Sequence, residues 1–244
     1  MTEMLEQILR ECAPYTKQGK LADYIPELTK ANPNDFGICI ILNDKKFSMA
    51  GDYQKKFTIQ SVVKPILLLQ ALIDNGINCV KDHIGVEATG KPFDAINYND
   101  KSLLSENINP MVNVGAIAMC TLIKGESYNE KFNRLLDLTR KLANNPNIKL
   151  DQEVYLSEKR TGNKNRANYV NAILITCGMY DGSGEFAVKV GVPAKSGVGG
   201  GIMAVVPSRM GIGIFSPTID NKGNSVAGIK ALEKLSKELN LSIF

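Results

Sequence analysis

Strand patterns occur near both ends of this chain, and helical patterns fill the part between them. Residues 36–42 and 47–51 predict a hairpin, because two apolar runs flank the polar turn Asn43-Asp44-Lys45-Lys46. Further strands are expected over 185–190, 201–206 and 210–215. We therefore expect a mixed α+β fold, in which an antiparallel sheet built from both chain ends is flanked by helices and carries an inserted helical lobe.

Helical periodicity and capping residues indicate the other elements. The run after Ser61 should end at an Asn-Gly stop near Gly76, and Ser127 begins a capping-box pattern. The last helix should bury one stripe, formed by Val226, Ile229, Leu232 and Leu235. The expected helical segments are 2–12, a short one around Pro26, 61–75, 113–122, 127–144, 151–158, 168–177 and 225–239.

The length of 244 residues suits one large or two small domains. We expect one unit over 1–244, with a sheet lobe over about 1–60 and 177–244 and a helical lobe over about 61–176. Residues 76–110 are rich in Gly, Pro and Asn, and such long irregular connections are often functional.

Composition excludes several classes of function. The net charge is only +4, and no basic block carries interleaved aromatic residues, which argues against nucleic-acid binding. No apolar run reaches the length of a membrane span, and residues 1–7 do not form a signal peptide. Five cysteines without a Cys-x-x-Cys pair indicate reduced thiols, so we expect a cytoplasmic protein. With a single histidine, His83 in an expected loop, we predict no metal site and no cofactor.

Ser61 and Lys64 are the strongest candidates for catalysis. Their spacing places both side chains on one face of a helix, about one turn apart. A serine hydroxyl needs an adjacent base, and a lysine whose pKa is lowered by burial can serve as one. The apolar residues that follow predict a buried helix, although Pro65 disfavours helical geometry at Lys64. The alternative is a chance spacing with a solvated surface lysine.

Two further stretches are ambiguous when taken alone. Asn113 opens an apolar helix, where it is either a cap or a buried amide facing a ligand, and local sequence favours the cap. The segment Lys195-Ser196-Gly197 is not a phosphate loop, because Ala194 and Lys189 stand where that pattern requires glycine. It is the near equivalent of the Lys-Thr-Gly triplet that serine acyl transferases carry on a strand beside the active site. The alternative is therefore that Lys195-Ser196-Gly197 lies on a sheet strand beside a catalytic site.

Five motifs in this order resemble the glutaminase family, whose members share the fold of serine β-lactamases and penicillin-binding proteins. The resemblance covers most of the chain, and residues 19–26 also resemble the family's tyrosine-bearing N-terminal segment. The five motifs are Gln60-Ser61-Val62-Val63-Lys64-Pro65, residues 109–117, Leu156-Ser157-Glu158, residues 177–184 and Pro193-Ala194-Lys195-Ser196-Gly197-Val198.

This resemblance implies hydrolysis of L-glutamine to L-glutamate and ammonia. Ser61 would be the nucleophile and Lys64 its base, with Tyr180 assisting proton transfer near the leaving ammonia. Val198 and Ser61 would give backbone N–H groups to the oxyanion. The full set implied to contact substrate is Tyr24, Ser61, Asn113, Glu158, Asn165, Tyr180 and Val198.

A carboxylate beside two asparagines suits a zwitterionic substrate, since the carboxylate faces its ammonium and the amides face its carboxylate. Glu158, Asn113 and Asn165 form that set, and Tyr24 would line the pocket. The resemblance also implies a homo-oligomer, often a tetramer.

One stretch of the family pattern is missing. After Asn165-Arg166-Ala167 the family continues for several tens of residues, whereas here 168–176 leads almost directly to the Cys-Gly-Met-Tyr segment. The missing stretch usually completes the helical lobe and carries another substrate-contacting tyrosine. The missing stretch leaves open a catalytically silent glutaminase-like protein that binds glutamate or assembles with a relative. The Ser-x-x-Lys spacing leaves open an enzyme that acts on β-lactams.

Overall fold

Strands from both ends of the chain form one five-stranded antiparallel sheet, in the order β2-β1-β5-β4-β3. The computed structural model describes residues 1–85, 108–160, 178–206 and 209–242, and no side chain at 114 or 158–160. The sequence-based prediction of a mixed fold around an antiparallel sheet is therefore confirmed. The strands are β1 (Gly37–Leu42), β2 (Phe47–Gly51), β3 (Ala194–Ser196), β4 (Gly201–Val206) and β5 (Met210–Phe215).

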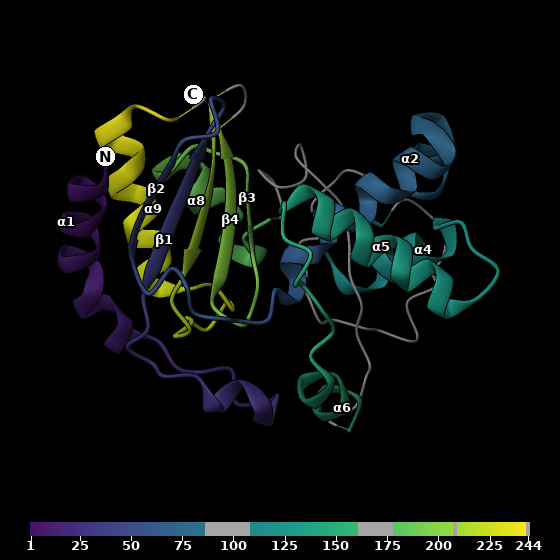
Figure 1. Cartoon of the computed structure of the whole chain (residues 1–244), viewed down its shortest axis with the longest axis horizontal. Helices are drawn as coiled ribbons and strands as arrows, with labels where there is room; N and C mark the ends of the chain where they lie inside the picture. The colour runs from purple at the N-terminus through teal and green to yellow at the C-terminus, as the bar shows by residue number, and fades with distance from the viewer. Residues whose placement is uncertain (86–107, 161–177, 207–208, 243–244) are drawn as a thin grey trace.

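The two terminal helices cover one face of this sheet. Helices α1 (Thr2–Cys12) and α9 (Val226–Leu239) lie side by side along it (Figure 1). Across the sheet, Ile40 of β1 pairs with Ile212 of β5, which pairs with Ala204 of β4, so one buried layer faces the helices. Alternation with a period of two residues places these side chains on the same face.

The buried stripe of α9 differs from the predicted one. Leu232 and Leu235 are buried as expected, whereas Val226 and Ile229 are only half-buried. Ala227 and Ala231 lie fully inside in their place. Small residues let the helix approach the sheet closely, and a search for large apolar side chains passes over them.

The predicted strand over 185–190 is wrong. The structure has a helix there, α8 (Ser183–Lys189), preceded by the single turn η4 (Tyr180–Gly182). The buried side chains are Ser183, Phe186 and Val190, a helical spacing, while Val188 is 88% exposed. In so short a stretch, the order of apolar and polar residues fits the two-residue period of a strand and also the 3.6-residue period of a helix. Packing against the sheet selects the helix.

The regular elements described between the two ends of the chain are helices and short helical turns. The predicted stop at Gly76 is observed, because its backbone (φ 76°, ψ 165°) is not helical, and a second helical segment then continues to His83 within the range of α2. His83 is exposed at the end of α2 and does not lie in a loop. The elements are η1 (Ala13–Gln18), η2 (Pro26–Lys30), η3 (Gln60–Val63), α2 (Lys64–His83), α4 (Asn113–Leu122), α5 (Tyr128–Leu142) and α6 (Gln152–Arg160).

A second hydrophobic cluster joins α2 to α4, separate from the core beneath the sheet. Leu68, Met111 and Met119 are among its buried members. The predicted helix over 168–177 lies outside the described residues. Within the ranges that the structure describes, no helix combines the length and apolar character needed to cross a membrane.

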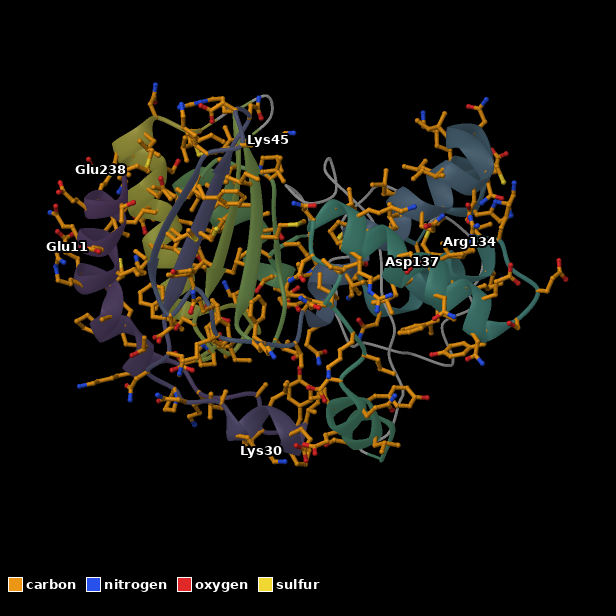
Figure 2. The ribbon with its side chains drawn as sticks, viewed as in Figure 1. Glu11, Lys30, Lys45, Arg134, Asp137 and Glu238 are labelled. Atoms are coloured by element: carbon orange, nitrogen blue, oxygen red, sulfur yellow. The ribbon has the colours of Figure 1, made fainter. Side chains whose placement is uncertain are left out.

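The buried carboxylate of Asp74 connects α2 with α5 and with the segment that follows α4. Asp74 on α2 accepts hydrogen bonds from Gln70 Nε2 (3.0 Å) and the backbone N–H of Lys124 (2.9 Å). It also pairs with Arg134 on α5, which is labelled in Figure 2. Because the acceptor is only 8% exposed, these charge-assisted bonds hold α2 and α5 in one arrangement.

Candidate active site

Ser61 lies in η3, the single tight turn that leads into α2. The residue before it, Gln60, has a positive φ of 43°, which non-glycine residues rarely adopt. Pro65 is accommodated because it occupies the first turn of α2, where its missing N–H is not needed. Ser61 is half-buried in this arrangement.

Lys64 is the first residue of α2 and is only 2% exposed. Its Nζ donates hydrogen bonds to Asn113 Oδ1 (2.8 Å) and to the backbone oxygen of Met111 (3.1 Å). Burial lowers the pKa of this amine from 10.5 to about 7, because desolvation disfavours its charged form. Lys64 forms no ion pair among the described residues, so little opposes that shift.

Asn113 is not the helix cap that local sequence favours. The capping position of α4 belongs to Val112, and Asn113 is the first helical residue. Its Oδ1 instead accepts the hydrogen bond from Lys64, a residue 49 positions away. The second reading of Asn113, a polar side chain in the site, is the one that the geometry supports.

Tyr180 lies beside Ser61, although 119 positions separate them in the chain. It is 7% exposed, and burial raises the pKa of its phenol to about 12. The neighbouring Ser61 side chain acts in the opposite direction on this pKa. The backbone of Tyr180 has a positive φ of 52°, a strained conformation of the kind that gathers at functional sites.

Lys195 and Ser196 reach the same place on the edge strand β3. Both are fully buried, and Lys195 Nζ lies 4.1 Å from the centroid of the Tyr180 ring. The same Nζ donates to the backbone oxygen of Ser196 at 2.5 Å. Ser196 Oγ has no hydrogen-bond partner in the described part of the chain. The predicted placement of Lys195 on a strand next to Tyr180 and Ser61 is observed.

The turn that joins β3 to β4 lies directly on the segment that carries Ser61. A Cβ on Gly197 would stand 2.8 Å from the backbone oxygen of Ile59, and one on Gly199 would stand 2.7 Å from that of Thr58. Only glycine permits this approach without a shift of the backbone. Val198 sits between these two glycines and is 6% exposed.

The N-terminal segment reaches the site through apolar contacts. Ala22 packs in one small cluster with Tyr180 and Val198, and Leu28 packs against it. Tyr24, two residues beyond Ala22, is 52% exposed. The structure therefore brings the Tyr24 segment next to Tyr180 and Val198.

Glu158 and Asn165 are the two predicted substrate contacts whose placement is not described in full. Glu158 belongs to α6, without a described side chain, and Asn165 lies outside the described residues. Figure 2 shows Lys30 of η2 beside α6, and its Nζ lies 3.6 Å from a carboxylate oxygen of Glu153. A cavity of about 280 Å³ lies between η2, α6 and the glycine turn, bordered by Leu28, Thr58, Asp151, Val154, Val198 and Gly199 among others.

No group of three or more potential metal ligands occurs among the described residues.

Two residues that the sequence analysis passed over also belong to the surroundings of Tyr180. Ser183 Oγ accepts a hydrogen bond from the backbone N–H of Met179 and donates one to the backbone oxygen of Tyr180. Asn224 Nδ2 donates to the backbone oxygen of Met179 at 2.9 Å. Ser183 lies within the motif at residues 177–184 but had no role assigned to it, whereas Asn224 belongs to no motif and only the fold places it near Tyr180.

Sequence comparisons agree with this geometry. A sequence model of the glutaminase family matches residues 19–169 and 166–244. Glutaminase 2 of Clostridium perfringens is 43% identical over 305 aligned positions, which cover all of both chains. A glutaminase of Clostridioides difficile is 42% identical over 302 positions, covering 99% of this chain and 98% of the relative.

Solved structures of similar sequence have the same fold. A probable glutaminase from Bacillus subtilis, complexed with 6-diazo-5-oxo-L-norleucine, superimposes with a TM-score of 0.86 at 29% identity, covering 100% of this chain and 96% of the other. The Bacillus subtilis glutaminase YbgJ, in a covalent complex formed with the same reagent, gives the same score and identity, with coverage of 100% and 99%. The β-lactamase-like architecture expected from the resemblance is consistent with these matches.

The comparisons also locate the missing stretch. The two segments matched by the family model meet at residues 166–169 of this chain. An alignment of 305 positions against a chain of 244 residues leaves at least 61 positions of the Clostridium perfringens relative without a counterpart. The relatives therefore carry an internal segment that this chain lacks.

Proposed function

Because this chain belongs to the glutaminase family, we propose that it hydrolyses the side-chain amide of L-glutamine, giving L-glutamate and ammonia through an acyl-enzyme on Ser61. The bond formed first joins Ser61 Oγ to the amide carbon, and the bond broken is the one from that carbon to nitrogen. Water then releases glutamate from Ser61. No metal or cofactor takes part in this scheme.

The buried amine of Lys64 is the observation that carries the proposal. A neutral amine has two N–H groups and one lone pair, and the Asn113 and Met111 oxygens accept from the amine. The lone pair is thereby left for the Ser61 proton. With its pKa lowered to about 7, a large share of Lys64 is neutral at neutral pH and can act as the base.

Tyr180 supplies a proton on the leaving-group side. A phenol whose pKa is raised to about 12 stays protonated at neutral pH and can donate toward the departing nitrogen. Lys195, whose Nζ lies over the Tyr180 ring, supports negative charge that develops on the phenol oxygen. The backbone N–H groups of Ser61 and Val198 stabilise the oxyanion, in keeping with the close approach of their two segments.

The substrate's α-amino and α-carboxylate groups are bound by side chains of the helical part. Asn113 Oδ1 accepts from Lys64, which leaves the two donors of its Nδ2 for a carboxylate. We assign recognition of the ammonium to Glu158 and further substrate contacts to Asn165 and Tyr24, as the family resemblance implies. Ser196 at the end of β3 and Gly197 in the turn that follows support the pocket, since the Ser196 hydroxyl has no hydrogen-bond partner among the described residues.

A second candidate function is favoured by the missing segment. A pocket without part of its helical wall can bind glutamate or assemble with a longer relative without turning glutamine over. The two candidates differ in one measurement, because only the enzyme releases ammonia from glutamine. Acylation of Ser61 by a β-lactam is a third outcome, and intact mass after incubation with penicillin detects it.

Assembly and compartment follow from the family resemblance and from the thiols. We infer a homo-oligomer, with a tetramer as the expected form, and light scattering on the purified protein measures it. Four of the five cysteines lie in the described residues as free thiols: Cys12, Cys39, Cys79 and Cys120. Free thiols suit a reducing cytoplasm.

Removal of either reacting group tests the enzyme. Ser61→Ala removes the nucleophile and Lys64→Ala removes the base, so each should lower ammonia release from glutamine on the order of 10⁴-fold or more. The assay compares glutamine with asparagine, whose amide is one methylene shorter. We expect glutamine to be the preferred substrate.

Lys46→Ala is the matched lysine control, because Lys46 is exposed in the β1–β2 turn and, within the described part of the chain, forms an ion pair with Asp44 alone. It should keep full turnover. Turnover retained in Ser61→Ala would rule out the acyl-enzyme. An inactive unmodified chain that still binds glutamate would favour the second candidate.

A further inference from the structure

Tyr180 holds a backbone conformation that its own residue type disfavours. Its φ of 52° lies in the left-handed region, where a tyrosine side chain costs free energy relative to glycine. Such a conformation persists only when surrounding contacts hold it. The contacts around residues 179–183 therefore decide whether the phenol stays beside Ser61.

Ser183 forms the first of these contacts. Its hydroxyl accepts the backbone N–H of Met179 (3.0 Å) and donates to the backbone oxygen of Tyr180 (2.8 Å). Ser183 is 2% exposed, so water does not compete for either bond. One side chain thus closes the turn on both sides of the Tyr180 backbone.

Asn224 forms the second contact, from a distant part of the chain. Its Nδ2 donates to the Met179 oxygen at 2.9 Å, and the residue is 1% exposed. A carbonyl oxygen can only accept, which fixes the orientation of the amide. Asp220 Oδ1 holds Asn224 by accepting its backbone N–H at 2.9 Å.

The same loop also touches the ring of Tyr180. Gly223 has φ 89°, and a Cβ there would stand 3.3 Å from Tyr180 Cε2 and 3.4 Å from Val198 Cγ1. The loop that carries Asn224 therefore packs against both the phenol ring and the turn at Val198. Its position is coupled to that of the proposed proton donor.

We propose that Ser183 and Asn224 are positioning residues that hold the strained Tyr180 backbone, so that the phenol meets Ser61 and the leaving nitrogen. This inference rests on the proposed function, because it assigns Tyr180 the proton-transfer step. Neither side chain contacts the reacting atoms. Their loss should lower kcat through Tyr180 and leave the binding of glutamine largely unchanged.

The test compares two buried serines that make the same type of bond. Ser183→Ala removes the bonds around Tyr180, whereas Ser236→Ala removes a bond from Ser236 Oγ to the Val190 oxygen (2.6 Å), on α9 away from the site. Both variants should lose thermal stability, because each removes a buried hydroxyl bonded to a main-chain carbonyl. Only Ser183→Ala should lower kcat, by about tenfold or more, with KM within about twofold.

Asn224→Asp gives an independent variant of nearly the same shape. It replaces the Nδ2 donor with an oxygen facing the Met179 oxygen, so kcat should fall as in Ser183→Ala. In a Tyr180→Phe background, neither variant should reduce kcat further, because the group that they position is already gone. Additive losses in that background would overturn the inference, as would equal kcat in Ser183→Ala and Ser236→Ala.

These outcomes separate the inference from the proposed function. If Tyr180→Phe keeps full turnover while Ser61→Ala is inactive, amide hydrolysis stands and the positioning of a proton donor is wrong. If the unmodified chain neither releases ammonia nor is labelled on Ser61 by 6-diazo-5-oxo-L-norleucine, the proposed function fails and the inference fails with it. A loss of turnover in Ser183→Ala with KM raised in parallel would indicate a general disturbance of the pocket and would also overturn it.

Discussion

At the scale of single residues, the burial of Lys64 decides whether its amine can act as a base. A surface lysine three residues after a serine would stay protonated and could not accept the serine proton. Here the amine is enclosed, with oxygen acceptors at Met111 and Asn113 and no ion pair among the described residues. Desolvation then lowers its pKa to about 7. The same amine is therefore protonated at acid pH and neutral above about pH 7.

This shift predicts a pH dependence of the reaction. Below about pH 7 the protonated amine cannot act as a base, so kcat/KM for glutamine should rise as pH increases through about 7 and then level off. Initial rates of ammonia release between pH 5 and 9 measure the curve. A profile without an inflexion between about pH 6 and 8 would contradict the assignment of Lys64.

Imidazole is the other side chain that ordinarily titrates in this range. The chain has one histidine, His83, which is exposed at the end of α2. His83→Gln is therefore the control, and it should keep the same inflexion. Loss of the inflexion in this variant would contradict its assignment to Lys64.

At the scale of elements, the turn between β3 and β4 decides how close two distant segments come. The turn carries Val198, and the segment before η3 carries Thr58 and Ile59. The backbones meet at Gly197 and Gly199, where even one methyl group would collide with a backbone oxygen. A turn that stands farther away would withdraw the Val198 N–H from the oxyanion site that we propose.

Gly199→Ala should therefore impair the reaction. Its Cβ would stand 2.7 Å from the Thr58 oxygen, which forces the turn or the Ser61 segment to shift. A shift of about 1 Å lowers kcat on the order of 10²-fold. The measurement is kcat for glutamine together with the thermal midpoint.

Gly184→Ala is the matched control on α8. Nothing lies within 4 Å of the position that its Cβ would take. Alanine favours a helix over glycine, so this variant should keep its activity and be as stable as the unmodified chain or more stable. Full activity in Gly199→Ala would show that the close approach of the turn is unimportant.

For the whole molecule, the candidate site lies where two separately packed regions meet. The core beneath the sheet and the cluster of α2 and α4 share no buried residue among those described. Tyr180 and Lys195 belong to the sheet side, while Lys64 and Asn113 belong to the helical side. Figure 1 shows α2, α4 and α5 to one side of the sheet and α1 and α9 on the other.

This division predicts unfolding in more than one step. Among the residues that the structure describes, the helical cluster holds fewer buried members than the core beneath the sheet, and this chain lacks a segment that its relatives have. The helical part should therefore unfold first on heating. Met119→Ala should lower the midpoint temperature of the first transition, and Leu232→Ala should lower that of the second. Each substitution should destabilise its region by about 2–5 kcal/mol. Differential scanning calorimetry measures both.

A ligand that bridges the two regions should couple them. Saturating glutamate should raise the midpoint temperature of the first transition toward that of the second, because a ligand that binds only the folded site stabilises it. One cooperative transition in the unmodified chain, lowered equally by both substitutions, would show a single folding unit.

The sequence by itself determined the local patterns and the spacing of Ser61 and Lys64. The hairpin at residues 36–51, both strands over 201–215 and the capped helix after Ser127 follow from alternation, turns and caps, which are properties of neighbouring residues. The family order of the motifs followed from the sequence as well. The segment over 185–190 shows the limit, because its pattern fits a strand and a helix equally.

Only the tertiary structure decided what the candidate residues can do. The pKa of Lys64 depends on its burial, and the oxygens that accept hydrogen bonds from its amine lie 47 and 49 positions away. Asn113 provides one of these acceptors instead of the expected helix cap. The backbone of Tyr180 depends on Ser183 and on Asn224 from beyond β5. Solvation, strain and long-range contacts arise from packing, which no pattern of neighbouring residues contains.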